Sequence, residues 1–401
     1  MRKAIPYGKQ EITPEDIQAV VETLLSDFLT QGPKIAEFES EFAKYVDSKY
    51  AIAVSNGTAA LHLAVMSLSL QENEYVICTP ITFSASANCV KYCKGQVLFA
   101  DIDPHTYLMD LDSVKTVIKN NPDKKIKGII PVDFAGRVPQ LADFRKLADE
   151  HNLWIIEDAC HAPGGYFIDE NDKKQLAGNG QFANLSVFSF HPVKHIATGE
   201  GGMITTNDEV LYKRLLTLRT HGITRDTDLF ANSIEFAVGN SPDHDSYPTW
   251  YMEMQELGYN YRLTDFQAAL GLSQLKRADQ NLSKRNAIAK YYTEAFETIP
   301  QIFQHSGLIE GHAYHLFVLE VEDRKGLYDY LRSQNIFAQI HYIPVHLMPY
   351  YKNQGYKVGD FPHAETYYSR CISIPMYPSL TKEDLDFVIL SIRQFYSQSI
   401  S

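Results

Sequence analysis

The chain has 401 residues, of which 49 are acidic and 37 are basic, so its formal net charge is −12. This acidic balance argues against a dedicated nucleic-acid-binding protein, which usually presents a basic face. Aromatic residues make up 12% of the chain, a composition far from that of a disordered protein. A chain of this length can bury a sizeable core, and we expect one large and one small domain.

Five cysteines lie along the chain without a Cys-x-x-Cys pair, at positions 78, 89, 93, 160 and 371. Their odd number and spacing favour reduced thiols over a disulfide framework or a zinc knuckle. The N-terminal segment lacks the apolar stretch of a signal peptide, and no apolar run is long enough for a membrane helix. We therefore expect a soluble, cytoplasmic protein.

The first half of the chain alternates short apolar runs with helical patterns. Thr13 is a good N-cap and Pro14 suits the first helical position, so a helix is predicted to begin there. Further strands are predicted at 50–54, 75–78, 96–100, 127–132 and 153–157, with helices at 57–68, 84–93, 111–119 and 141–151. This alternation predicts an α/β fold with a mostly parallel sheet covered by helices on both faces.

The second half has a different pattern. Strands are predicted at 184–190, 202–206, 315–321 and 338–341, and helices at 208–218, 264–277, 281–298, 325–333 and 382–396. Residues 225–256 are polar and weakly patterned, which indicates a loop insertion or lid. We place the domain boundary near residue 280, with a large domain over 1–280 and a small one over 281–401.

A turn that could seat a phosphate lies between the strand at 50–54 and the helix that follows it. Its sequence is Ser-Asn-Gly-Thr-Ala-Ala over residues 55–60. Gly57 permits close approach of the backbone, and the free N–H groups of a helix start attract anions. The alternative is an ordinary capped turn. It is not a Walker A loop, because no Gly-Lys-Ser/Thr follows.

An acid and a lysine complete the candidate chemistry. Asp158 ends a buried strand, where a carboxylate is costly unless it is paired, for instance with a cationic ring nitrogen. The alternative is a strand-end Asp that caps the next segment. Lys194 follows an apolar strand and precedes a glycine-rich turn, and a lysine with a lowered pKa there can form a Schiff base. The alternative is a solvated surface lysine.

Two other patterns resemble ligand-binding motifs, but we do not interpret them as sites. Residues 178–183 fit Gly-x-Gly-x-x-Ala but precede a strand, whereas a dinucleotide-binding loop must follow a strand and open a helix. The histidines of 341–346 flank a proline without a carboxylate at ligand spacing, so we predict no metal site. The turn at 55–60 that could seat a phosphate, the acid Asp158 and the lysine Lys194 together suggest pyridoxal 5′-phosphate as cofactor.

These segments also resemble a known family in their order and spacing. The sequence resembles the DegT/DnrJ/EryC1/StrS sugar aminotransferases, which have the aspartate-aminotransferase-like fold type I of pyridoxal-phosphate-dependent transferases. The resemblance covers nearly the whole chain, and its anchors are 56–58, 80–88, 157–161, 188–194 and 258–264. It implies an α/β fold with a large, mostly parallel sheet domain and a smaller C-terminal α/β domain.

The resemblance also implies roles for individual residues. Lys194 would be the Schiff-base lysine and proton shuttle, and Asp158 the partner of the pyridinium nitrogen. Phe83 would stack on the cofactor ring, and His161 would lie near its 3′-hydroxyl. The phosphate seat would comprise Gly57, Thr58, Ala59 and Ser189, with Asn260 reaching it from the neighbouring subunit of a homodimer. The candidate substrate-binding residues are Gln31, Arg219, His221, His341, Tyr342 and His346.

Three segments resemble the branch of the family that serves pseudaminic acid biosynthesis, namely 26–33, 87–89 and 270–277. This implies amination of C4 of a UDP-linked 4-keto-6-deoxy-N-acetyl hexose, with L-glutamate as donor. One alternative is an aminotransferase for another nucleotide sugar, dTDP- or GDP-linked, acting at C3 or C4. A sugar 3-dehydratase would carry histidine in place of Lys194. A non-catalytic regulatory relative would have lost Lys194 or Asp158.

Overall fold

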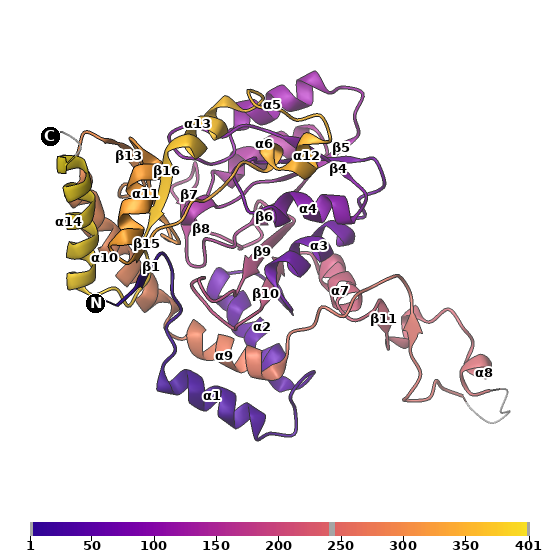
Figure 1. The fold of residues 1–401 in the computed structure, drawn as a ribbon. Helices are drawn as coiled ribbons and strands as arrows, with labels where there is room; N and C mark the ends of the chain where they lie inside the picture. Colours follow the sequence, from indigo (N-terminus) through magenta and orange to yellow (C-terminus); the bar gives the residue numbers. More distant parts are fainter. Residues whose placement is uncertain (1–2, 240–244, 399–401) are drawn as a thin grey trace.

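The computed structural model describes residues 3–239 and 245–398. Residues 240–244, which belong to the predicted insertion, lie outside this description. Figure 1 shows a large α/β body, a smaller body that holds the C-terminal helix, and an arm that projects from the large body.

A seven-stranded sheet forms the centre of the large body, in the order β2-β10-β9-β6-β5-β3-β4. Its strands are β2 (Tyr50–Val54), β3 (Tyr75–Cys78), β4 (Gln96–Phe99), β5 (Ile126–Ile130), β6 (Trp154–Asp158), β9 (Leu185–Ser189) and β10 (Gly202–Thr206). β10 is the one strand of this sheet that runs opposite to all the others. The predicted large, mostly parallel sheet is therefore confirmed.

Helices cover both faces of this sheet. Successive side chains of a strand point to opposite faces, and each face is apolar and packs against helices. On β2, for example, Ile52 and Val54 pack in one core, and Ala51 and Ala53 in the other. The first face is covered by α3 (Gly57–Ser67), α4 (Ala85–Tyr92) and α7 (Glu209–Leu218). The second is covered by α2 (Pro33–Val46), α5 (Leu111–Asn120), α6 (Leu141–Glu150) and α9 (Asp265–Leu275).

The predicted N-terminal helix is α1 (Pro14–Leu24), and it packs against α9 (Figure 1). Thr13 and Asp16 form a reciprocal capping box at its start, which satisfies two free amides. Buried Asp16 also pairs with Arg277 at 2.6 Å, so the cap and the packing of α1 share one carboxylate.

The smaller body contains a three-stranded antiparallel sheet in the order β13-β14-β16. Its main elements are α10 (Ala278–Phe296), β13 (Ile302–His305), β14 (Phe317–Val321), α11 (Arg324–Ser333), β16 (Cys371–Ile374) and α14 (Lys382–Gln398). Its connecting helices are η3 (Val345–Leu347), α12 (Pro349–Lys352) and α13 (Pro362–Arg370). The large body also contains η1 (Phe134–Gly136) and a hairpin formed by β7 (Tyr166–Ile168) and β8 (Lys174–Leu176).

The N-terminal strand β1 (Ile5–Pro6) pairs in parallel with β15 (Ile336–Phe337) of the smaller body. Ile5 is buried in the same core as Phe317 and Ile392. The boundary predicted near residue 280 lies in the first turn of α10, so the ranges 1–280 and 281–401 remain a prediction. The strand expected at 338–341 is wrong in its bounds, because the strand is β15 and Gln339 makes only an isolated bridge with Ser373.

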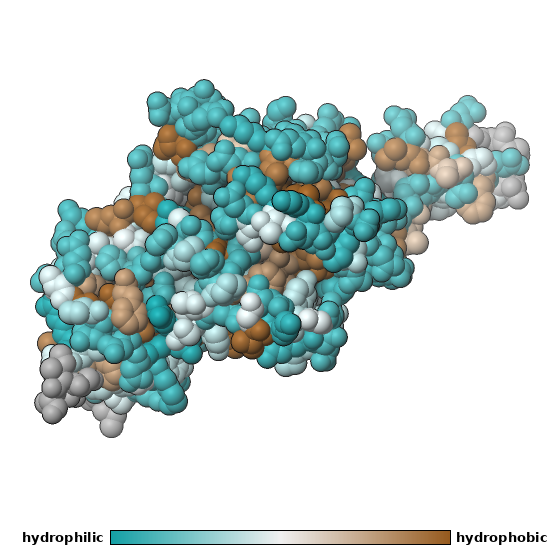
Figure 2. Space-filling model, turned by 90° about the horizontal axis from the view of Figure 1, so that it is seen from above, coloured by the Kyte–Doolittle hydropathy of each residue, from teal (hydrophilic) through white to brown (hydrophobic). Residues whose placement is uncertain are grey.

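The insertion forms the projecting arm seen in Figures 1 and 2. The arm starts with β11 (Ile223–Thr224), which directly precedes the predicted insertion, and continues with η2 (Thr227–Leu229), α8 (Ile234–Ala237) and β12 (Glu253–Met254). β11 and β12 pair as an antiparallel hairpin at its base. The Glu253 carboxylate accepts hydrogen bonds from the amides of Ala231 and Asn232, at 2.7 and 2.9 Å, which orders the arm where regular structure is sparse. Among the described helices, none has the length and apolar character to cross a membrane.

Candidate active site

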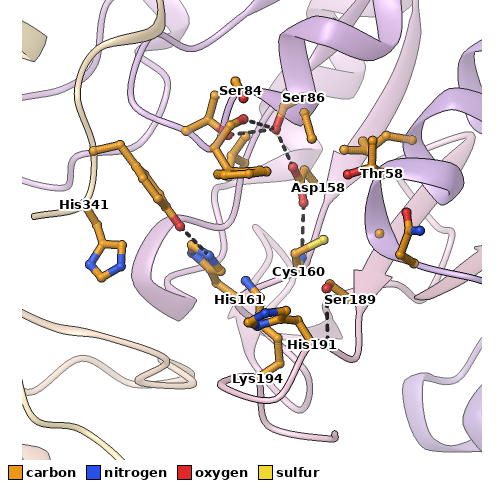
Figure 3. Close-up of a pocket in the computed structure, with 18 of the residues that line it drawn as sticks. Thr58, Ser84, Ser86, Asp158, Cys160, His161, Ser189, His191, Lys194 and His341 are labelled. Carbon is orange, nitrogen blue, oxygen red and sulfur yellow. Dashed lines mark hydrogen bonds between the residues drawn. The ribbon is translucent and has the colours of Figure 1, made fainter. Parts of the chain in front are cut away.

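A cavity of about 900 Å³ lies at the carboxyl ends of β2, β6 and β9. This is the edge at which open parallel sheets bind ligands. The smaller body supplies part of its wall through 339–343, and Tyr7 contributes from the N-terminal segment. Figure 3 shows the side chains that converge here.

Asp158 is 5% exposed and lines the cavity. Ser86, on the first turn of α4, donates a hydrogen bond of 2.6 Å to its Oδ2, and the Cys160 amide donates one of 3.3 Å to Oδ1 (Figure 3). These donors stabilise an ionised carboxylate at a buried position. The arrangement fits a partner for a protonated ring nitrogen.

Lys194 lies in the connection between β9 and β10, and its amine points into the cavity (Figure 3). Its backbone amide donates to the His191 carbonyl at 2.8 Å, which closes a tight turn. Burial lowers the pKa of Lys194, while Cys160 and Asp158 act in the opposite direction. A lowered pKa increases the fraction of neutral amine, the form that attacks an aldehyde.

The start of α3 forms a cradle that fits a phosphate. The first amides of a helix have no intrahelical partner, so those of Gly57 and Thr58 are available beside the hydroxyl of Ser189. The Ala59 amide already donates to Asn56 Oδ1 at 2.8 Å, so its direct part in the predicted seat is limited. A Cβ on Gly57 would lie only 2.9 Å from Ser189 Cβ, so glycine allows these two elements to approach.

The hydrogen bonds of His161 define its tautomer. The Ala135 amide donates to Nδ1 at 3.3 Å, so the hydrogen is on Nε2, which faces the Tyr342 hydroxyl at 3.2 Å. Burial lowers the pKa of His161 well below its usual range, and nearby Lys194 adds to the effect. A neutral His161 therefore donates its Nε2 hydrogen to the Tyr342 hydroxyl.

The other aromatic candidates line the same cavity. Phe83 is 60% exposed, and its ring centroid is 6.3 Å from that of Tyr342. His341 also lines the cavity, with Nδ1 2.9 Å from Ser373 Oγ, and burial lowers its pKa to about 3. The structure thus brings together every predicted catalytic residue with most of the predicted cofactor residues.

Five predicted residues do not line the cavity of their own chain. Arg219 donates to Glu39 and to the Ala53 carbonyl, at 2.5 and 2.8 Å, so its guanidinium is engaged in the core of the large body. His346 is fully buried and contacts Glu365 at 3.1 Å. These two substrate-binding predictions are not supported, because both side chains are held by carboxylates. The remaining three are Gln31, His221 and Asn260, all exposed.

The sequence interpretation missed several residues of the cavity wall. Ser86 lies within the segment 80–88 that anchored the family resemblance, and its place in that segment is the signal that could have pointed to it. Tyr7, His315 and Gln339 come from distant segments and carry no local signal. Among the residues described, no group of three or more His, Cys, Asp or Glu is arranged to hold a metal ion.

The fold and this set of residues define a pyridoxal-phosphate-dependent enzyme of fold type I. Residues 10–393 match the model of the DegT/DnrJ/EryC1/StrS aminotransferase family, and the chain belongs to that family. Members of this family are sugar aminotransferases that use pyridoxal phosphate, so the predicted class and cofactor are confirmed.

Curated relatives match over almost their full length. The Bacillus subtilis spore coat polysaccharide biosynthesis protein SpsC is 38% identical, covering 97% of this chain and 96% of its own. A Campylobacter jejuni UDP-4-amino-4,6-dideoxy-N-acetyl-β-L-altrosamine transaminase is 33% identical, covering 96% and 95%. The Escherichia coli O157:H7 GDP-perosamine synthase is also 33% identical, covering 98% and 99%.

Solved structures give the same result. Helicobacter pylori PseC, an aminotransferase of pseudaminic acid biosynthesis, matches with a TM-score of 0.86 and 28% identity, covering 99% of this chain and 100% of its own. Spr1654 from Streptococcus pneumoniae, in its PLP form, matches with a TM-score of 0.86 and 26% identity, covering 98% and 99%.

Proposed function

We propose that this sugar aminotransferase transfers an amino group from L-glutamate to C4 of a UDP-linked 4-keto-6-deoxy-N-acetyl hexose, as a step of pseudaminic acid biosynthesis. The observation that carries the proposal is the full-length similarity to the Campylobacter transaminase and to PseC, together with Lys194 and Asp158 in one cavity. The class of enzyme does not depend on this choice of substrate.

The cavity residues divide the work of the reaction. Pyridoxal phosphate, when bound, supplies the electron sink. Lys194 would anchor it and carry a proton to and from the reacting carbon, which its lowered pKa favours. Asp158 would hold the ring nitrogen, and the helix start at Thr58 would hold the phosphate. The Tyr342 hydroxyl would donate a hydrogen bond within the cavity.

We also propose a homodimer in the cytoplasm. The UDP diphosphate needs cations, and among the described residues Lys194 is the only Lys or Arg that lines the cavity. A second subunit would supply the missing charge and Asn260. The arm also exposes large apolar side chains, since Phe236 is 65%, Trp250 66% and Met254 65% exposed. These side chains are our candidates for contact with a second subunit, since large exposed apolar patches mark interaction sites.

A GDP-linked ketosugar is the second candidate. The GDP-perosamine synthase of Escherichia coli has the same identity to this chain as the Campylobacter enzyme, over a slightly larger share of it. Identity alone therefore does not favour one nucleotide. Lys194 stands where a dehydratase would need histidine, and the presence of both Lys194 and Asp158 argues against a non-catalytic role.

The test is a substrate panel on cofactor-loaded protein with glutamate as donor. We expect a UDP-linked 4-keto-6-deoxy-N-acetyl sugar to yield a 4-amino sugar, identified by mass and NMR. Turnover of only the dTDP- or GDP-linked ketosugar would overturn the substrate and leave the class intact. Formation of 2-oxoglutarate from glutamate, followed alone, reports the donor half-reaction and separates a wrong sugar from an inactive protein.

A further inference from the structure

Three buried acidic residues lie where β5 and β6 end, and the roles proposed so far use only one of them. Asp133 is fully buried, Glu157 is 1% exposed and Asp158 is 5% exposed. The Asp133 amide donates to the Asp158 carbonyl at 3.0 Å, and the Asp158 amide donates to the Pro131 carbonyl at 2.9 Å. The backbone thus fixes Asp133 directly beside β6. Glu157 and Asp158 are successive residues of a strand, so their side chains leave opposite faces.

The oxygens of Asp133 and Glu157 are not equally satisfied. Glu157 Oε2 accepts from the Gly178 amide at 2.9 Å and from Ser186 Oγ at 2.5 Å. Within the described part of the chain, Glu157 Oε1 and both carboxyl oxygens of Asp133 are buried without a donor. Ionised carboxylates only accept, so two of them side by side cannot satisfy each other.

A single shared proton resolves this arrangement. A protonated carboxyl group becomes a donor, and the two side chains are then hydrogen-bond partners. Burial raises the pKa of Asp133 well above its usual range, and the neighbouring acids Glu157 and Asp158 add to the effect. Burial raises the pKa of Glu157 to about 7, although hydrogen bonds from Ser186, the Gly178 amide and Asp133 act to lower it. Glu157 Oε2 already accepts two hydrogen bonds and the Asp133 oxygens accept none, so the negative charge belongs on Glu157 and the proton on Asp133.

Among the residues that the structure describes, no basic group acts on Asp133 or Glu157. The charged groups that act on Asp133 both come from β6 and both are acids, Glu157 and Asp158. The segment after β8 and strand β9 supply only the neutral donors Gly178 and Ser186. Ionised carboxylates at all three acids would place three like charges together in a buried region, which is unfavourable.

We propose that Asp133 is a neutral carboxylic acid that donates its proton to the Glu157 carboxylate, and that this pair is a positioning element for Asp158. The pair then carries one negative charge instead of two, and Asp158 is left as the carboxylate that faces the cavity. The shared proton follows from the buried carboxyl oxygens without a donor and from the contact between the two carboxyl groups. Its effect on the cofactor rests on the role proposed for Asp158.

Infrared difference spectra test the proton directly. The spectrum of wild type minus Asp133→Asn at neutral pH should contain the C=O band of a protonated carboxyl group. Labelling the aspartate side-chain carboxyl with ¹³C should shift this band, and labelling glutamate should not. Absence of the band, or a shift only with labelled glutamate, would overturn the assignment. Glu157→Gln should also remove the band, and the exposed Asp123→Asn control should keep it.

Unfolding as a function of pH gives a second readout that needs no cofactor. The unfolded chain releases the Asp133 proton at the ordinary pKa of Asp, whereas the folded protein keeps it to a higher pH. The wild type therefore loses stability as pH rises from the ordinary pKa of Asp to the raised pKa of Asp133 in the folded protein. The expected loss is about tenfold in the folding equilibrium per pH unit. Asp133→Asn, whose amide donates without titrating, should show a flatter profile. Parallel profiles for wild type and variant would overturn the proposal.

The effect on Asp158 is read from the visible absorbance of bound cofactor as pH is varied. Asp133→Asn keeps the single charge on Glu157 and should keep the midpoint. The double variant Asp133→Asn/Glu157→Gln removes that charge and should move the midpoint to lower pH, because a charge that stabilises the protonated cofactor is lost. Equal midpoints in both variants would overturn the positioning role, whatever the protein's substrate proves to be.

Discussion

The hydrogen bond from Ser86 to Asp158 provides the sharpest test of the active-site geometry. The bond is 2.6 Å long, both side chains are buried, and Asp158 is the acid that we expect to pair with the cofactor ring nitrogen. Ser86→Ala removes the donor and leaves a carboxylate oxygen without its strongest neutral partner. A hydrogen bond to a charged group contributes about 1.5–3 kcal/mol, and each 1.4 kcal/mol is about tenfold in affinity.

Because this bond is also present without cofactor, its full contribution is an upper limit, and we expect Ser86→Ala to weaken cofactor binding by at most roughly a hundredfold. The assay is equilibrium titration of the cofactor-free protein with pyridoxal phosphate, followed by absorbance. Ser67→Ala is a matched control, because Ser67 is also buried and donates at 2.9 Å to the Ala64 carbonyl, away from the cavity. The reasoning is refuted if Ser86→Ala binds the cofactor like wild type, or if both variants weaken binding equally.

Three further predictions follow from individual contacts. Arg219→Ala should lower the free energy of unfolding by about 3 kcal/mol, because Glu39 keeps a largely buried charge without its cation, and the KM for the sugar should stay unchanged; partial recovery of stability in Arg219→Ala/Glu39→Gln checks the cause. Cofactor attachment to Lys194, followed by stopped-flow absorbance, should accelerate as pH rises, with a midpoint below the ordinary lysine value; a midpoint at that value would contradict the burial of the amine. Tyr342→Phe should destabilise the protein by about 1–3 kcal/mol, seen in chemical denaturation, because the Nε2–H of His161 loses its acceptor; an unchanged midpoint and slope would mean that His161 has another partner.

The parts of the site predicted from sequence are those with a local signature. Asp158 ends an apolar strand, Lys194 follows one, and Thr58 opens a helix after a glycine. Hydrophobic periodicity and capping chemistry fix such elements within a few residues, and the topology of a parallel sheet then brings their ends together. The strands β2, β3 and β10 match their predicted bounds for this reason.

The parts that were missed or misassigned depend on contacts between distant segments. His346 and Arg219 have the chemistry of ligands for a diphosphate, and nothing nearby in sequence shows that Glu365 and Glu39 fold against them. Tyr7 enters the cavity only because β1 pairs with β15. Local patterns do not encode such long-range partners. The carboxylate partners of His346 and Arg219 and the position of Tyr7 could therefore not be predicted without the fold.

The pairing of β1 with β15 also has a consequence for synthesis. Ile5 and Ile336 are register partners, about 330 residues apart in the chain. At about 5–20 residues per second, a ribosome needs roughly 15–70 s to make the intervening chain. Throughout that time β1 has no strand to join. The smaller body can complete its core only after β15 has been made, so β1 folds long after it has itself been synthesised.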